Sequence, residues 1–248
     1  MKEPIITLRN VCAKYTGALV LKGVNLDLFG GEVVGLVGAN GSGKTTLVNV
    51  LCGNIEPVAG EFWFEDTLVH FESAADALSR GIRMLPQTLE IYPSLNVLEN
   101  IFIGQEIGRG VSMVPMMAWR TMDALAVRLL DRVGASGVAP MGSIEALSGG
   151  QKKAVALSRL LAREAAMLVF DEPMAALGLH QKERLLEIFK AEAGRGCGIV
   201  FISHDIDDVL RICDRVVVLA DGVVVKDVPR DQTDKAAITA EMVRGQTP

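Results

Sequence analysis

The sequence has few cysteines, few aromatic residues and no long uncharged hydrophobic run. Its four cysteines are scattered, without the C-x-x-C spacing of a zinc site or the density of a disulfide framework, so we expect reduced, mostly buried thiols. No apolar run approaches the ~18 residues that cross a membrane. The N-terminus lacks an apolar segment followed by a cleavage site, which predicts a cytosolic chain without direct membrane insertion.

An excess of basic residues is also absent. Lys and Arg number 25 against 30 Asp and Glu, and the net charge is -5. No run of Lys and Arg offers the positive surface that DNA, RNA or anionic lipid requires, so we predict no nucleic-acid partner. Any contact with a membrane would therefore pass through another protein.

What the sequence does contain is an alternation of strand and helix patterns over 248 residues. Many of the apolar runs are too continuous to have one solvated face, which predicts an α/β fold with a mostly parallel sheet covered by helices. The early strands follow one another through turns and predict a small antiparallel flank. The β-rich runs are 5–11, 24–34, 32–38, 61–66, 81–86, 167–173, 198–204 and 215–225. The helical patterns are 44–51, 74–80, 96–103, 115–133, 149–163, 179–193 and 205–212.

The middle of the chain differs from its two ends. Between Thr88 and Gln151 the sequence shows helical patterns and Gly- and Met-rich connections but no strand pattern. We therefore predict a single domain over 1–248, with a core formed by 1–87 and 152–248 and a helical insert at 88–151.

A glycine-rich loop at 38–45 fits the pattern G-x-x-x-x-G-K-[ST] between a predicted strand at 32–37 and a predicted helix. Glycines let the backbone turn its N–H groups inward, and the helix start adds positive charge, so the loop predicts a phosphate site. The lysine adds a charge for the β- and γ-phosphates, and the following threonine offers a hydroxyl to Mg2+. The predicted nucleotide-binding residues here are Gly38, Ala39, Asn40, Gly41, Ser42, Gly43, Lys44, Thr45 and Thr46.

Two carboxylates follow an apolar strand in the segment MLVFDEP. Open α/β sheets bind ligands at the carboxyl ends of their strands, so Asp171 and Glu172 are predicted beside the phosphate loop. Asp171 could hold the Mg2+ shell through water, and Glu172 could deprotonate an attacking water. By itself such a pair is more often two solvated loop residues; the phosphate loop favours a catalytic interpretation.

A second glycine cluster, LSGGQ at 147–151, opens another predicted helix. Ser148, Gly149, Gly150 and Gln151 therefore predict a second anion cradle of hydroxyl and free N–H groups. One nucleotide does not need two cradles in one subunit. In these motifs the sequence resembles the ATP-binding cassette family, with the Walker A motif at 38–45, the signature at 147–151 and the Walker B motif at 168–172.

The resemblance covers nearly the whole chain and implies a P-loop NTPase core that binds ATP and Mg2+. It implies that Tyr15 stacks on adenine and that Gln87 touches Mg2+ and the catalytic water while linking to the insert. His204 would hold the γ-phosphate and that water. It also implies a head-to-tail dimer of two copies around two ATP molecules, membrane-spanning permease subunits, an indirectly associated substrate-binding protein, and a place on the inner face of the membrane.

Two positions depart from the commonest cassette pattern. Met174 stands where Ser or Thr is usual, and Gly178 stands where the D-loop commonly has Asp. However, the segments AALG, NVLENIFIGQE and AAITAEMVRG resemble the ATPases of ribose, xylose and fructose importers. The segment GVSMVPMMAW at 110–119 suits either a small core of the insert or a surface for the permease, and we place Met116 and Met117 at or near that surface.

The leading hypothesis is thus an ATPase that powers a membrane importer for a sugar or similar small polar solute. An importer of another solute, such as a branched-chain amino acid or a nucleoside, stays open. A soluble cassette ATPase acting on DNA or ribosomes usually carries two cassettes, long coiled coils or basic arms, which this sequence lacks. A nucleotide-gated module without turnover is a third alternative, disfavoured by Glu172 and His204.

Overall fold

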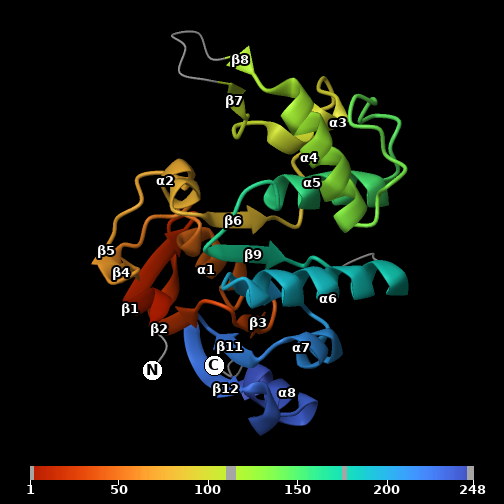
Figure 1. The fold of residues 1–248 in the computed structure, drawn as a ribbon. Coiled ribbons are helices and arrows are strands. Elements are labelled where there is room, and N and C mark those ends of the chain that lie inside the picture. The colour runs from red at the N-terminus through yellow and green to blue at the C-terminus, as the bar shows by residue number, and fades with distance from the viewer. Residues whose placement is uncertain (1–2, 110–115, 175–177, 245–248) are drawn as a thin grey trace. The chain divides into compact units, whose positions relative to one another are not determined.

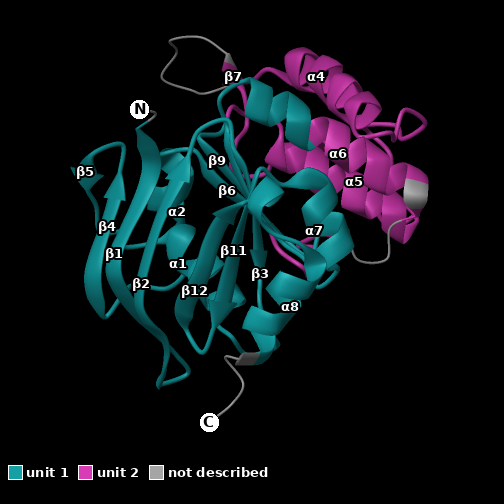
Figure 2. Ribbon diagram, turned by 90° about the horizontal axis from the view of Figure 1, so that it is seen from below, with its two compact units in different colours: residues 1–84, 165–175, 189–248 teal, residues 85–164, 176–188 magenta. Residues whose placement is uncertain are grey.

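The computed structural model in Figure 1 describes residues 3–109, 116–174 and 178–244. The chain forms two compact units, which Figure 2 colours separately. The first contains residues 1–84, 165–175 and 189–248, and the second contains residues 85–164 and 176–188. The second unit therefore includes residues beyond the predicted insert at 88–151. The division of the chain into a core and this insert stays a prediction.

A six-stranded sheet forms the centre of the first unit, with the strand order β12-β11-β3-β10-β9-β6. Strands β11, β3, β10 and β9 pair in parallel, and β12 closes one edge antiparallel to β11. Every residue of β3, β9 and β10 is buried, as expected for strands covered on both faces. The strands are β3 (Val33–Val37), β6 (Ile82–Leu85), β9 (Met167–Asp171), β10 (Gly198–Ile202), β11 (Arg215–Ala220) and β12 (Val223–Pro229).

A smaller antiparallel sheet has the order β2-β1-β4-β5 and confirms the predicted flank. Its strands are β1 (Pro4–Tyr15), β2 (Ala18–Phe29), β4 (Ala59–Phe64) and β5 (Thr67–Leu68). One hydrophobic core joins this sheet, helix α1 and the large sheet. The helices of the first unit are α1 (Lys44–Leu51), α2 (Ala74–Ser79), α7 (Ile206–Ile212), η1 (Arg230–Gln232), α8 (Lys235–Arg244) and the C-terminal part of α6 (Leu179–Gly194).

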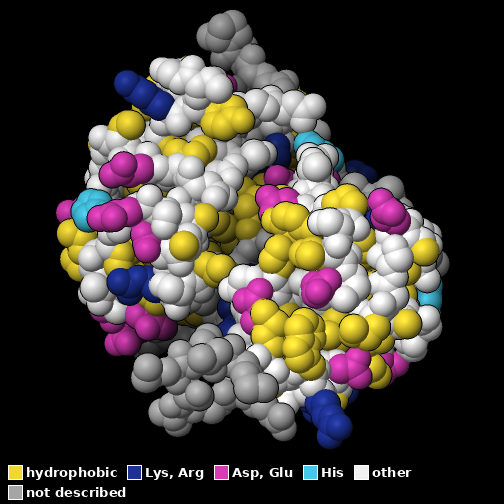
Figure 3. All heavy atoms as spheres, turned by 90° about the horizontal axis from the view of Figure 1, so that it is seen from above, with side chains coloured by type: hydrophobic (Ala, Val, Ile, Leu, Met, Phe, Trp, Pro, Cys, Tyr) yellow, Lys and Arg dark blue, Asp and Glu magenta, His cyan; other side chains and the backbone are white. Residues whose placement is uncertain are grey.

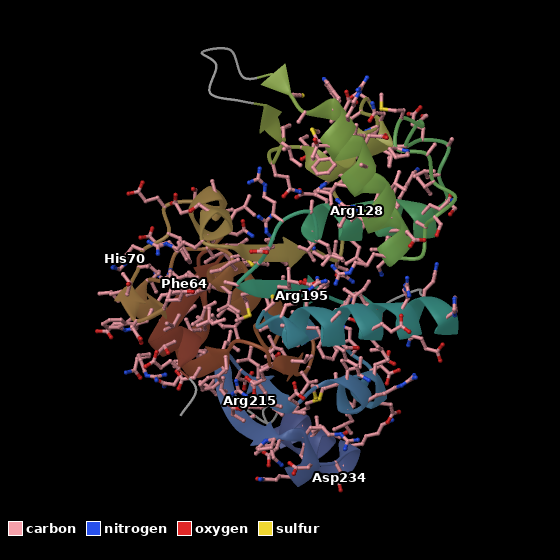
Figure 4. All side chains as sticks on the ribbon, viewed as in Figure 1. Phe64, His70, Arg128, Arg195, Arg215 and Asp234 are labelled. Atoms are coloured by element: carbon pink, nitrogen blue, oxygen red, sulfur yellow. The ribbon has the colours of Figure 1, made fainter. Side chains whose placement is uncertain are left out.

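A half-buried arginine ties strands of the two sheets together. Arg215, labelled in Figure 4, contacts the carboxylates of Glu32 and Asp227 and also donates to the backbone oxygen of Asp27. Because the guanidinium fork satisfies several acceptors at once, its hydrogen bonds offset the cost of burying the charge. Burial acts to lower the pKa of Arg215, but the two carboxylates outweigh it and raise the pKa.

The second unit is mainly helical. Its core consists of apolar side chains from three helices and the connections between them. The helices are α3 (Val97–Phe102), α4 (Trp119–Arg132), α5 (Gly149–Leu160) and the N-terminal part of α6. Figure 3 shows hydrophobic side chains among charged ones on one face of the molecule. In the second unit, the side chains of Met117 and Trp119 are 43% and 47% exposed.

Most predicted elements are confirmed, but two expectations were wrong, and two helices, η1 and α8, were missed. The insert is not free of strands, because β7 (Gly108–Arg109) pairs antiparallel with β8 (Met116–Met117). For the same reason the helix predicted at 115–133 begins only at Trp119. Strands of two residues leave no period-2 pattern to detect. Helix α8 was not predicted, and residues 110–115 of the Met-rich segment lie outside the described residues.

The sequence predicts reduced, mostly buried cysteines and no membrane-spanning segment, and the described residues bear on both predictions. All four cysteines are free there, and three of them are buried, with Cys12 half-buried. None of the helices described has the length and apolar character needed to cross a membrane.

Candidate functional site

The predicted phosphate loop joins β3 to α1 in the first unit. Gly43 precedes α1 with a φ of 105°, a left-handed conformation that glycine adopts without strain. Lys44 is only 7% exposed, and its Nζ donates to the backbone oxygens of Gly38 at 2.8 Å and Ala39 at 2.9 Å. Burial lowers the pKa of Lys44, while the charges of Glu172 and Asp171 oppose that shift. The loop thus holds a positive charge close to two carboxylates.

The loop also contains a buried polar atom without a protein partner. Ser42 Oγ is buried and meets no hydrogen-bond partner among the described residues. A Cβ on Gly38 would lie 2.2 Å from the backbone oxygen of Leu219 and 2.6 Å from Ser42 Oγ, so only glycine fits there. Because buried polar groups are normally hydrogen-bonded, an orphan hydroxyl next to a buried lysine fits an anionic ligand.

The turn after β11 supports the loop and was missed as a functional feature. Gly222 N donates to Ser42 O at 3.0 Å, and Lys22 N donates to Gly222 O at 2.9 Å. The φ of Gly222 is 80°, and a Cβ there would lie only 1.8 Å from Val20 O. The Asp-Gly pair at 221–222 is a recognisable turn signal, but nothing in the sequence shows which loop the turn supports.

The two predicted carboxylates lie at the end of β9. Asp171 is the last residue of the strand and is 7% exposed, and the side chain of Glu172 is 10% exposed. Glu172 has a φ of 53°, which is rare for a residue with a side chain, and its N–H donates to Ile202 O on β10. Non-glycine residues held in this conformation cluster at functional sites.

His204 lies beside Glu172. Its Nε2 is 3.2 Å from Glu172 Oε1, yet Glu172 Oε1 is buried without a hydrogen bond from any described residue. The imidazole is therefore close to the carboxylate but is not aligned to hydrogen-bond with it. Burial raises the pKa of Glu172, and the neighbouring His204 opposes the shift. Burial likewise raises the pKa of Asp171.

Tyr15 ends β1 and is 54% exposed. It pairs with Ala18 at the start of β2. Further along β2, the side chains of Val20 and Leu21 lie beside Gly43 of the phosphate loop. The ring therefore belongs to a hairpin next to the loop, and its exposed face is available to a flat ligand.

The second cradle lies in the second unit. Ser148 precedes α5, and its Oγ accepts from Gln151 N at 3.3 Å while Gln151 Oε1 accepts from Ser148 N at 3.0 Å. In this capping box Ser148 Oγ acts as an acceptor, so its hydroxyl hydrogen stays available as a donor beside the free backbone N–H groups of the helix start. A cavity of about 390 Å³ adjoins it, lined in part by Gly150, His180 and Arg184.

Gln87 also belongs to the second unit and is exposed in the bend after β6. The predicted site residues are therefore divided. The first unit brings together the phosphate loop, Asp171, Glu172 and His204, with Tyr15 on a neighbouring hairpin. Gln87 and the signature residues occupy the other unit, and their predicted contacts with nucleotide stay predictions.

The two departures from the cassette pattern differ in their surroundings. Met174 is 4% exposed and serves the core. Gly178 is exposed, and its N–H donates to Gln181 Oε1 at 3.2 Å near the start of α6. Residues 175–177 between them lie outside the described residues. No group of three or more His, Cys, Asp and Glu side chains forms a metal site within 3–109, 116–174 and 178–244.

The family model described as ABC transporter matches residues 21–175, which include both cradles and the carboxylate pair. The chain belongs to the ABC transporter family. It is 34% identical over 97% of its length to "Ribose import ATP-binding protein RbsA 3" of Rubrobacter xylanophilus. It is also 34% identical over 97% of its length to "Ribose import ATP-binding protein RbsA" of Caldanaerobacter subterraneus.

The solved structures share the same fold. A nucleotide-free ATP-binding cassette from an ABC transporter superposes with a TM-score of 0.83 at 24% identity, over 99% of both chains. A dimeric bacterial ABC transporter cassette gives a TM-score of 0.78 at 27% identity, over 91% of this chain and 98% of that one. The chain spans about half the length of the curated relatives, 48% and 49% of the two ribose import proteins.

Proposed function

We propose that this chain binds and hydrolyses ATP and that the turnover powers a membrane importer for a sugar or similar small polar solute. The observation that carries the proposal is the buried pair Asp171 and Glu172, close to the buried charge of Lys44. Two curated relatives named as ribose import ATP-binding proteins support a sugar as the transported solute. The tight clustering of titratable groups with shifted pKa values supports catalysis.

The phosphate loop would bind the nucleotide's triphosphate. Its backbone N–H groups and the start of α1 favour negative charge, and Lys44 would meet the β- and γ-phosphates. The orphan hydroxyl of Ser42 supports the fit, because a bound phosphate oxygen would satisfy it. Thr45 is exposed at the start of α1, and with Asp171 and Gln87 it would hold Mg2+, which neutralises charge on the phosphates.

Glu172 would act as the general base. Its buried, unpartnered Oε1 would accept a proton from water while the water oxygen forms a bond to the γ-phosphorus. The bond from the γ-phosphorus to the bridging oxygen breaks, and ADP leaves with that oxygen. A raised pKa makes this carboxylate a better proton acceptor than a solvated glutamate. His204 would position the water and the γ-phosphate.

The signature cradle would act on the nucleotide of a second copy. The relatives are about twice as long as this chain, so one copy corresponds to half of such a protein. The dimeric cassette among the similar structures supports pairing. We propose that two copies enclose two ATP molecules, that permease subunits hold the pair at the inner face of a membrane, and that a substrate-binding protein delivers the solute.

Transport can be tested with the chain and its permease reconstituted into vesicles that contain Mg-ATP on the ATPase side. We expect uptake of labelled ribose or a related sugar, loss of uptake with Lys44→Ala, and normal uptake with the exposed control Lys190→Ala. Absence of ATP hydrolysis would reject the enzymatic part. Hydrolysis coupled to another solute, without sugar uptake, would reject only the sugar.

A further inference from the structure

An arginine inside the second unit joins two segments that the sequence keeps far apart. Arg159, on α5, donates from Nε to Asn100 O at 2.6 Å and from NH1 to Glu90 O at 2.7 Å. Its NH2 donates to Asn100 Oδ1 at 3.3 Å, and the guanidinium lies 5.5 Å from the ring centroid of Tyr92. One side chain of α5 thus holds both α3 and the segment before it.

Asn100 completes this arrangement from the other side. It is 0% exposed, and its Nδ2 donates to Tyr92 O at 3.0 Å and Leu95 O at 3.1 Å. Its Oδ1 accepts from Tyr92 N at 3.0 Å. The amide therefore fixes the backbone of 92–95 onto α3 while it also accepts from Arg159. We call Glu90, Tyr92, Asn100 and Arg159 the α5 clamp.

The hydrogen bonds of the α5 clamp are better suited to fixing the orientation of its segments than to stabilising their packing. Burial lowers the pKa of the Arg159 guanidinium against the opposing effect of Tyr92 and Glu90, so its charge is partly desolvated, and it donates to the neutral oxygens of Asn100 and to the backbone oxygen of Glu90. An apolar residue could join α5 to the surrounding hydrophobic core without that desolvation cost. A planar fork with directed hydrogen bonds instead fixes the distance and orientation of the two segments.

The positions of the clamped residues connect the α5 clamp to nucleotide chemistry. Helix α5 begins at Gly149, directly after the N-cap residue Ser148 of the signature cradle. Glu90 and Tyr92 lie three and five residues after Gln87. The α5 clamp therefore joins the segment after Gln87 to the helix that follows the signature cradle through a few short hydrogen bonds.

We propose that Arg159 and Asn100 are positioning residues for ATP turnover, because the α5 clamp makes the Gln87 segment and the signature helix move as one body. This inference rests on the proposed function, in which both segments act on ATP. Neither residue was predicted from the sequence. The signal was a lone arginine within an apolar helix pattern, which is more often a solvated side chain than a buried connector.

The test compares Arg159→Lys with Arg163→Lys, a matched arginine three residues after the end of α5. Arg163 also donates to backbone oxygens, but these belong to Gln105 and Glu106, outside the segment 90–95. Arg159→Lys keeps the charge and loses the fork. We expect its kcat to fall about tenfold with KM for ATP unchanged, whereas Arg163→Lys behaves as the wild type.

Hydrogen exchange in 88–96 supplies a readout that does not depend on ATP turnover. We expect exchange there to accelerate about tenfold in Arg159→Lys and to stay unchanged in Arg163→Lys. If Arg159→Lys does not fold, Tyr92→Leu removes only the ring contact from a residue that is 41% exposed, and a smaller change in the same two readouts is expected.

Each outcome separates the α5 clamp from the proposed function. Unchanged exchange in 88–96, a kcat equal to that of Arg163→Lys, or a rise in KM without loss of kcat would overturn the positioning role. A wild-type protein that hydrolyses no ATP would overturn the proposed function and the turnover role together. Faster exchange in Arg159→Lys would then still establish the mechanical link.

Discussion

The two glycine cradles of this chain share a pattern and differ in chemistry. The cradle before α1 contains a buried lysine, an orphan serine hydroxyl and nearby carboxylates with raised pKa values. The cradle before α5 is exposed, carries no charged residue, and satisfies its own serine and glutamine through a capping box. Burial and charge accompany the first cradle only.

This difference suggests a division of labour. Groups that are desolvated and lack protein partners raise the energy of the empty site and reward a charged ligand. An exposed, capped helix start offers backbone N–H groups, one serine hydroxyl hydrogen and the helix dipole, which bind an anion weakly without further partners. The first cradle is suited to bind and react, and the second to cap a nucleotide that another subunit already holds.

The largest expected effect is on catalysis. Glu172→Gln keeps the shape of the side chain and removes the proton acceptor. Because a positioned general base contributes ~10²–10⁴-fold, we expect kcat to fall by about that factor while the affinity for Mg-ATP changes little. Phosphate release and equilibrium nucleotide binding measure the two quantities. Turnover close to that of the wild type would remove Glu172 from the role of base.

A smaller effect is expected on binding at the first cradle. Lys44→Ala removes the buried ammonium group from the loop. Loss of one charge-assisted hydrogen bond costs ~1.5–3 kcal/mol, so we expect the Kd for Mg-ATP to rise about 10–100-fold. Titration with a fluorescent ATP analogue measures it, with Lys190→Ala as the control. An unchanged Kd would show that the lysine does not meet the phosphates.

Glu172→Gln, which lowers the catalytic activity, should raise the free energy of unfolding. Burial raises the pKa of Glu172, so its ionised form is disfavoured in the folded state. The stability linked to this group is therefore present at low pH and is lost as the pH rises through the folded pKa. We expect Glu172→Gln to be more stable than the wild type at pH 7 by ~0.5–2 kcal/mol, as at other active sites that trade stability for function.

Thermal unfolding of the nucleotide-free protein as a function of pH measures this gain. The advantage should shrink as the pH falls below the pKa of the carboxyl group. A variant less stable than the wild type at pH 7 would show that the carboxylate stabilises the fold and is not strained by burial.

The smallest effect on the cassette itself is expected in the second unit. Met117 is 43% exposed in β8, and substitutions at such surface positions change stability by about 0.5 kcal/mol or less. We expect Met117→Lys to keep folding and basal ATPase activity and to weaken co-purification with the permease. Retained association and transport would return this segment to the small core of its own unit. The side chain of Met116, the other residue predicted at this surface, is not among the described side chains.

Much of the first unit could be predicted from the sequence because its signals are local. Continuous apolar strands and the G-x-x-x-x-G-K-[ST] spacing placed Lys44, Asp171 and Glu172 at the same edge of the sheet. The support of Ser42 by the turn at Gly222 was not predictable, because it joins residues 180 positions apart in the sequence. The left-handed backbone of Glu172 was also invisible, since no glycine marks it.

The second unit was harder to predict. Its helices follow clear apolar periods, yet β7 and β8 are too short for any pattern, and they moved the start of α4 to Trp119. The contacts of Arg159 with Glu90 and Asn100 depend on tertiary packing, which the apolar pattern of α5 does not specify. The capping by Gln151 was available from the S-x-x-Q spacing, which predicts that the serine oxygen accepts from the N–H of Gln151.

The most direct test of the division between the two cradles is ATP-dependent dimerisation of Glu172→Gln, followed by light scattering. We predict that Mg-ATP doubles its mass and that adding Ser148→Arg abolishes the dimer while each monomer still binds ATP at the first cradle. The exposed substitution Lys190→Arg, as a control, should leave the dimer intact. A dimer that forms equally well with Ser148→Arg would contradict the account, because the second cradle would then not cap the partner's nucleotide.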